Sequence, residues 1–170
     1  MACGMVRKVD ELGRVVIPKE MRRVLNIKTG SSVEMFINDF NQVVLKKFSE
    51  ISNVLLFAEN LADVIFDNFK LPCLVADEEK ILICKGVSKK EYVNKNLNFE
   101  VQNKQGYFIL NKQNFLQDSK NNFEYVYVFN VLCEGFECGF IFLLCNEKLE
   151  QEKINNIILL KKFLSNILQF

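Results

Sequence analysis

Histidine and tryptophan are absent from this 170-residue chain, and no arginine occurs after residue 23. Without histidine, the sequence excludes Ser-His-Asp and Cys-His catalysis and lacks a common zinc ligand. We also find no glycine-rich phosphate loop and no nucleophile–base pair. These absences predict a protein that is not an enzyme and has no metal site and no cofactor.

Long apolar runs and an export signal are also missing. No stretch approaches the length that a membrane-spanning helix needs, and the start "MACGMVRK" lacks an apolar signal segment. We therefore expect a cytoplasmic protein that does not contact membranes. Buried free thiols suit that reducing compartment, and we expect them for the six scattered cysteines, which are Cys3, Cys73, Cys84, Cys133, Cys138 and Cys145.

The composition is that of an ordinary globular protein, with 49% hydrophobic and 25% charged residues. The formal net charge of +1 conceals an asymmetry between two parts of the chain. Residues 1–50 carry nine Lys and Arg against six Asp and Glu, whereas residues 51–170 carry thirteen against fifteen. The first part is therefore the candidate for contact with an anion.

The first fifty residues predict a β-β-α-β-β unit. Alternation favours strands at 4–10 and 14–18, separated by a turn in which Gly13 takes positive φ. Pro18 opens a helix over 18–26, and two more strands at 32–39 and 42–48 form a hairpin. The residues expected to face a core are Met21, Val24 and Leu25 of the helix and Val33, Met35 and Ile37 of the hairpin. Because so short a unit buries little apolar surface, it should need a partner chain.

The remaining residues predict an α+β sandwich. Helical periodicity runs from Ser49 to Phe69, through Ile51, Val54, Ala58, Leu61 and Ile65, and again over 149–169. Between these helices lie probable strands in "LPCLVADE", "KILICKG", "YFILNK", "EYVYVFNVLCEG" and "ECGFIFLLCN", the last two joined by an "EGFE" turn. Ser88 and Glu91 predict a capping box on a short helix. We expect domains at 1–50 and 51–170, the second including a linker helix at 51–69.

All four arginines lie in "VRKVDELGRVVIPKEMRRVL", residues 6–25, as Arg7, Arg14, Arg22 and Arg23. A guanidinium donates two parallel hydrogen bonds, which suits phosphate and the O6/N7 edge of guanine better than a lysine does. An alternative is that the arginines form surface ion pairs with Asp10, Glu11 and Glu20, which are common and contribute little to stability. The exclusive placement favours an anion-binding surface.

The segment "GMVRKVDELGRVVIPKEMRRVLNIKTGSSVEMFINDFNQVVLKKF", residues 4–48, resembles the AbrB-type DNA-binding domain of the transition-state regulators. The resemblance implies a dimeric swapped-hairpin β-barrel that contacts double-stranded DNA through Arg7, Lys8, Arg14, Arg22 and Arg23. Further on, "LADVIFDNF" and "GVSKKEYVNK" resemble the C-terminal domain of sporulation regulators in this group. That similarity implies a GAF-like sandwich with flanking helices that senses a small molecule or assembles a homotetramer.

These observations predict a sequence-dependent transcriptional regulator. By resemblance it acts on late sporulation genes at the nucleoid of the forespore. An alternative is an antitoxin-like module whose barrel binds a protein toxin as well as DNA. For the small molecule, position alone suggests Cys84, Ser88 and Tyr92, although core packing and helix capping explain each of them better.

Overall fold

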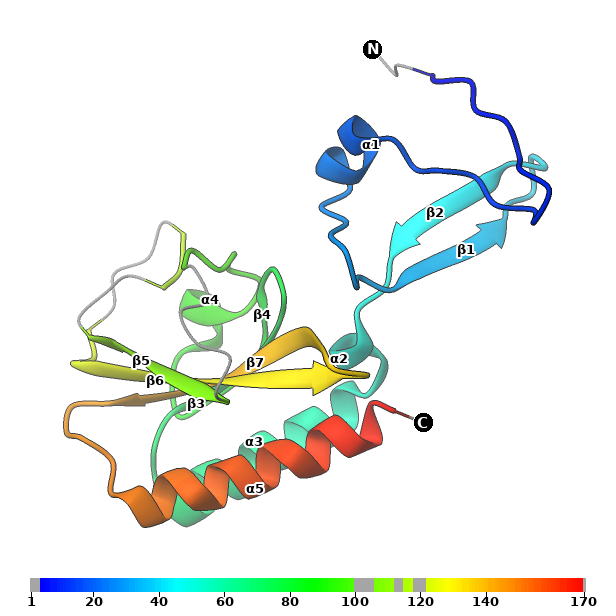
Figure 1. Cartoon of the computed structure of the whole chain (residues 1–170). Helices are drawn as coiled ribbons and strands as arrows, with labels where there is room; N and C mark the ends of the chain where they lie inside the picture. The colour runs from blue at the N-terminus through cyan, green and yellow to red at the C-terminus, as the bar shows by residue number, and fades with distance from the viewer. Residues whose placement is uncertain (1–3, 100–105, 112–114, 118–121, 170) are drawn as a thin grey trace. The chain divides into compact units, whose positions relative to one another are not determined.

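The computed structural model describes residues 4–99, 106–111, 115–117 and 122–169 (Figure 1). The chain divides into two compact units, Met1–Phe48 and Ser49–Phe170. Both contain helices and antiparallel strands, so the predicted α+β class is confirmed. Within the described residues, no helix is long and apolar enough to cross a bilayer.

The first unit contains a short helix and a hairpin. Helix α1 spans Lys19–Val24, directly after Pro18, which stands at its N-cap. Strands β1 (Val33–Ile37) and β2 (Val43–Lys47) pair antiparallel, as predicted. Their turn is closed by Asn38, whose Oδ1 accepts the backbone N–H groups of Phe40 and Gln42.

Two predicted strands do not form in the single chain. Residues 4–10 and 14–17 are irregular and flank a turn at 11–13. Within the described residues of this unit, β1 and β2 form the only sheet. A strand needs a neighbour to accept and donate its backbone hydrogen bonds. Along these two segments no described strand supplies one.

The predicted core of the first unit is also wrong for the single chain. Helix α1 buries none of its residues, Val24 is 85% exposed, and Met35 and Ile37 are 68% and 69% exposed. Among its described large hydrophobic residues, only Ile27 is buried. The prediction that this unit cannot bury a core by itself is therefore confirmed, because its apolar side chains have no opposing layer to pack against.

The second unit is built on a five-stranded antiparallel sheet in the order β4-β3-β7-β6-β5. All five predicted strands are present, as β3 (Cys73–Asp77), β4 (Ile81–Lys85), β5 (Tyr107–Asn111), β6 (Tyr125–Cys133) and β7 (Phe136–Cys145). The two-residue turn between β6 and β7 has positive φ at both Glu134 and Gly135, the geometry of a type I′ hairpin.

Helices cover one face of this sheet. Helix α3 (Leu55–Phe69) and helix α5 (Gln151–Ile167) lie side by side along it (Figure 1). The apolar stripe predicted for residues 51–69 is confirmed, since Ile51, Ala58, Leu61 and Ile65 are buried. These side chains and their counterparts on α5 form the core layer between helices and sheet.

The helix predicted over 51–69 is interrupted. Helix α2 spans Glu50–Asn53 and ends at Val54, whose φ of −113° and ψ of 32° depart from helical values. Ile51 holds α2 against the sheet at Gly139, where a Cβ atom would collide with both Ile51 and the backbone of Ala76. Helices α2 and α3 are thus separate elements, so the single predicted helix is wrong.

The opposite face of the sheet carries a second core layer and the short helix α4 (Lys89–Tyr92). The predicted capping box is wrong, because the Ser88 side chain makes no capping bond and Glu91 donates its N–H to the Ser88 carbonyl instead. Cys84 and Tyr92 are buried in this layer, and the Cys84 thiol donates to the Val87 carbonyl. Both therefore pack as core residues.

The cysteines follow the expectation of buried thiols, apart from Cys3, which lies outside the described residues. Cys73, Cys84, Cys138 and Cys145 are buried and Cys133 is half-buried, all as free thiols. Burial raises the pKa of the Cys145 thiol to about 11, so it stays protonated at neutral pH. No group of three metal-ligating side chains comes together in the part of the chain that the structure describes.

Candidate nucleic-acid interface

The five predicted DNA-binding residues all lie on the surface of the first unit. Arg7 and Lys8 precede the turn at 11–13, Arg14 follows it, and Arg22 and Arg23 belong to helix α1. All five side chains are exposed. Adjacent helical residues leave the axis about 100° apart, so Arg22 and Arg23 reach different parts of the surface around α1.

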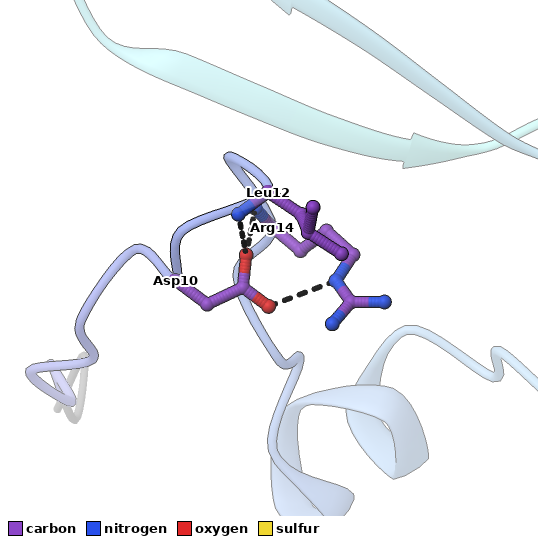
Figure 2. Close-up of polar contacts among 3 residues, drawn as sticks. All are labelled: Asp10, Leu12 and Arg14. Atoms are coloured by element: carbon purple, nitrogen blue, oxygen red, sulfur yellow. Dashed lines mark hydrogen bonds and ion pairs between the residues drawn. The ribbon is translucent and has the colours of Figure 1, made fainter.

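Asp10 builds the turn between these basic residues (Figure 2). Its Oδ1 accepts the backbone N–H of Leu12 at 3.0 Å and that of Arg14 at 2.8 Å. The backbone closes the same turn, because Asp10 donates its N–H to the Arg14 carbonyl and accepts from Gly13. Gly13 has a φ of +75°, a conformation that glycine adopts without the steric cost of a side chain.

Arg14 is tied to this turn through one nitrogen. Its Nε donates to Asp10 Oδ2 at 2.8 Å, whereas the two terminal guanidinium nitrogens extend past the carboxylate (Figure 2). The Arg14 side chain is 71% exposed, so these nitrogens face solvent. Asp10 thus orients Arg14 and leaves the terminal nitrogens positioned to donate to an anion.

The alternative, in which the arginines form surface ion pairs with Asp10, Glu11 and Glu20, explains one ion pair of the structure. Within the described residues, the Asp10–Arg14 pair is formed, and neither Glu11 nor Glu20 pairs with an arginine. Within the same residues, Arg7, Arg22 and Arg23 form no ion pair, and the terminal nitrogens of Arg14 extend past Asp10. Sequence reasoning treated Asp10 only as a charge partner; the signal for its turn-forming role was the Asp-x-x-Gly spacing at 10–13.

The Asp10 carboxyl should titrate below its usual range. Hydrogen bonds from the Arg14 backbone N–H and then from its side chain lower the Asp10 pKa. The turn is thus stabilised above the unfolded pKa of about 3.9, and this contribution is lost as the pH falls through the lower folded pKa. Carboxyl NMR titration should show the low Asp10 pKa in the wild type.

Replacing Arg14 with glutamine tests whether Arg14 lowers the pKa of Asp10. Arg14→Gln should raise the Asp10 pKa only part of the way, because the larger backbone contribution remains. Lys19→Gln removes an exposed cation from the same unit and should leave the Asp10 pKa unchanged. An Asp10 pKa that is the same in the wild type and in Arg14→Gln would show that the ion pair does not persist in solution.

Two family models match the chain, one for each unit. Residues 6–49 match the family described as antidote-toxin recognition MazE, a bacterial antitoxin. Residues 50–165 match the stage V sporulation protein T C-terminal family, described as a transcription factor. The second match alone covers more than half of the chain.

Curated relatives agree with these matches. Stage V sporulation protein T of Bacillus subtilis (strain 168) is 44% identical over 96 residues, which is 56% of this chain and 54% of the relative. The transition state regulatory protein AbrB of the same organism is 44% identical over 68 residues, covering 40% and 66% of the two chains. Its putative transition state regulator Abh is 53% identical over 45 residues, covering 26% and 48%.

The chain therefore spans from about half to two thirds of the length of these relatives. The resemblance of residues 4–48 to the AbrB-type domain is confirmed by the same matches. With an AbrB-like first unit and a second unit that matches the sporulation family throughout, the chain belongs to the stage V sporulation protein T C-terminal family of transcription factors.

Proposed function

We propose that this protein is a DNA-binding transcriptional regulator that contacts double-stranded DNA through Arg7, Lys8, Arg14, Arg22 and Arg23. The observation that carries the proposal is the confinement of every arginine to exposed positions of the first unit. The printed names of the relatives, which are transition state regulators and a sporulation protein, support the same function. Late, forespore-specific sporulation genes at the nucleoid are the targets we infer.

The first unit works as a swapped-hairpin barrel formed by two chains. On the hairpin, Met35 pairs with Leu45 and Ile37 with Val43, so all four side chains lie on one face. That face is largely exposed in the single chain, with Ile37 at 69% and Val43 at 64%. A second copy would cover this face and supply neighbours for residues 4–10 and 14–18, doubling the number of guanidinium groups on the surface.

The second unit mediates further assembly and senses a small molecule. Large apolar side chains remain exposed on both helices of its outer layer, among them Leu56 on α3 and Leu159 and Phe163 on α5, at 69%, 67% and 61%. Apolar surface of this kind favours association with another copy. We infer a homotetramer built from two barrel dimers, with a GAF-like second domain over 51–170 and the DNA-binding domain over 1–50.

DNA recognition rests on guanidinium contacts to phosphates and guanine edges. Helix α1 has six residues and carries no Asn or Gln that would read adenine. Much of the specificity then comes from DNA shape and deformability, while phosphate contacts set the position.

A salt series tests the proposal. Fluorescence anisotropy with promoter-sized duplex DNA should show log Kd rising with log salt, with a slope of about 0.9 for each phosphate neutralised. Four exposed arginines in each of two chains lead us to expect affinity to fall by a factor of about 10³ or more between 50 and 200 mM salt. Failure to bind duplex DNA at low salt would contradict the function.

An antitoxin-like role is the second candidate. It is favoured by the match of residues 6–49 to the MazE antitoxin family. Here, however, that domain is followed by a folded unit with a buried core. A pull-down that recovers a stable protein partner in place of DNA binding would favour this role.

A further inference from the structure

Arg14 is the one arginine whose side chain is held in place within the described residues. Its Nε donates to Asp10 Oδ2 at 2.8 Å, whereas Arg7, Arg22 and Arg23 form no ion pair in the same residues. A free arginine side chain samples many rotamers and loses that freedom when it meets a ligand. Because Arg14 has already lost part of its freedom, its guanidinium is the best prepared of the four for a contact that depends on direction.

Asp10 is itself anchored firmly enough to fix that direction. Its Oδ1 accepts the backbone N–H groups of Leu12 and Arg14, which leaves Oδ2 to receive the Arg14 side chain. The backbone closes the same turn, since the Asp10 N–H donates to the Arg14 carbonyl at 3.0 Å and the Asp10 carbonyl accepts from Gly13 at 3.0 Å. Both ends of the ion pair thus belong to one hydrogen-bonded turn, and the guanidinium keeps its orientation relative to that turn.

The ion pair also decides which group of DNA suits Arg14. Asp10 occupies Nε, so the donors that remain are the two terminal nitrogens, which extend away from the carboxylate (Figure 2). Two parallel N–H groups match the N7 and O6 acceptors of guanine. A phosphate is a poorer partner, because the Asp10 carboxylate offsets the positive charge of Arg14 and repels a second anion. The guanidinium groups of Arg7, Arg22 and Arg23 keep their full charge, which suits phosphates.

We propose that Arg14 reads a guanine in the major groove through its terminal nitrogens and that Asp10 is its positioning residue. Arg7, Arg22 and Arg23 then contact phosphates and set the position of the protein on the duplex. This assignment rests on the proposed DNA-binding function and adds to it a base and the residue that specifies it. Base recognition then lies in the turn at residues 10–14, outside helix α1.

A selection from a library of random-sequence duplexes tests the assignment with the full chain. The wild type should enrich a motif with a fixed guanine, and replacing that guanine with 7-deazaguanine, which lacks the N7 acceptor, should weaken binding about fivefold or more. Arg14→Lys keeps the charge without the paired donors, so its affinities for the two duplexes should lie within about twofold of each other. Arg22→Ala should weaken binding to both duplexes alike, as expected for a phosphate contact.

Asp10→Asn tests the positioning role. The amide keeps an oxygen for the backbone N–H groups of the turn, but its NH₂ group cannot accept a hydrogen bond from Arg14 Nε. The preference for guanine over 7-deazaguanine should therefore fall to within about twofold. General weakening of the fold would not produce this result, because it lowers both affinities alike. Glu11→Gln removes the same charge from the neighbouring exposed residue and should keep the preference.

The outcomes separate this assignment from the regulator function. A wild-type motif without a guanine, equal binding of the guanine and 7-deazaguanine duplexes by the wild type, or an unchanged preference in Arg14→Lys or Asp10→Asn would overturn the assignment. Failure to bind any duplex would overturn the regulator function and this assignment together. Binding without a guanine preference would overturn this assignment alone.

Discussion

Replacing Arg22 and Arg23 together with alanine is expected to weaken binding to duplex DNA by at least roughly a hundredfold at low salt, since a lost guanidinium contact costs about 1–3 kcal/mol. Both side chains are exposed on α1, and α1 buries none of its residues, so their removal leaves the packing of the unit intact. Anisotropy titrations across a salt series measure the affinity. The salt slope should also become shallower, because fewer phosphates are neutralised.

The matched control also removes two positive charges, but from the second unit instead of from α1. Lys89 and Lys90 form an adjacent, exposed basic pair on the short helix α4. Lys89→Ala/Lys90→Ala should bind DNA within about twofold of the wild type, because neither lysine belongs to the proposed interface. Sedimentation must show that both variants keep the wild-type mass. Equal DNA affinity for Arg22→Ala/Arg23→Ala and the wild type would exclude α1 from the interface.

Ile37→Asp is expected to separate the chains that form the proposed barrel and thereby to abolish DNA binding. In the single chain Ile37 is 69% exposed, so an aspartate there should have little effect on a monomer. In a dimer, the same position lies on the apolar face with Met35, Val43 and Leu45, and burying an unpaired carboxylate there costs several kcal/mol. The dimer dissociation constant should therefore rise by a factor of about a hundred or more, measured by analytical ultracentrifugation.

The neighbouring residue provides the control for this prediction. Glu34 lies on the opposite face of β1, and Glu34→Gln should preserve both mass and DNA affinity. Circular dichroism shows whether Ile37→Asp still folds its second unit, which has a separate core. An Ile37→Asp protein with wild-type mass and wild-type DNA affinity would rule out a barrel closed over this face of the hairpin.

The strands of the second unit were predictable because their side chains are buried on both faces of a central sheet. Val126 and Val128 pack on one face, and Tyr127 and Phe129 on the other, which produces the nearly continuous apolar run of β6. The turn between β3 and β4 is local as well, since Asp77 Oδ1 accepts the N–H groups of Glu79 and Lys80.

Other features depend on contacts that sequence reasoning did not weigh. The close approach of Ile51 to Gly139 joins residues far apart in the chain. Asn130 stands out in the sequence as one polar residue inside "YVYVFNVLC". Only the structure shows that it is buried and that its amide donates to Glu137 on the next strand.

Local chemistry in the sequence by itself determined the arginine cluster, the Asp10–Gly13 turn and the alternation of the strands, because each depends on residues within a few positions of one another. Burial was decided only by the tertiary structure, because it depends on which distant segments meet. Met35 and Ile37 have the alternation of core residues and lie exposed in the single chain, whereas Asn130 has the chemistry of a surface residue and is buried. The same apolar or polar pattern becomes core or interface according to whether the opposing layer belongs to the same chain.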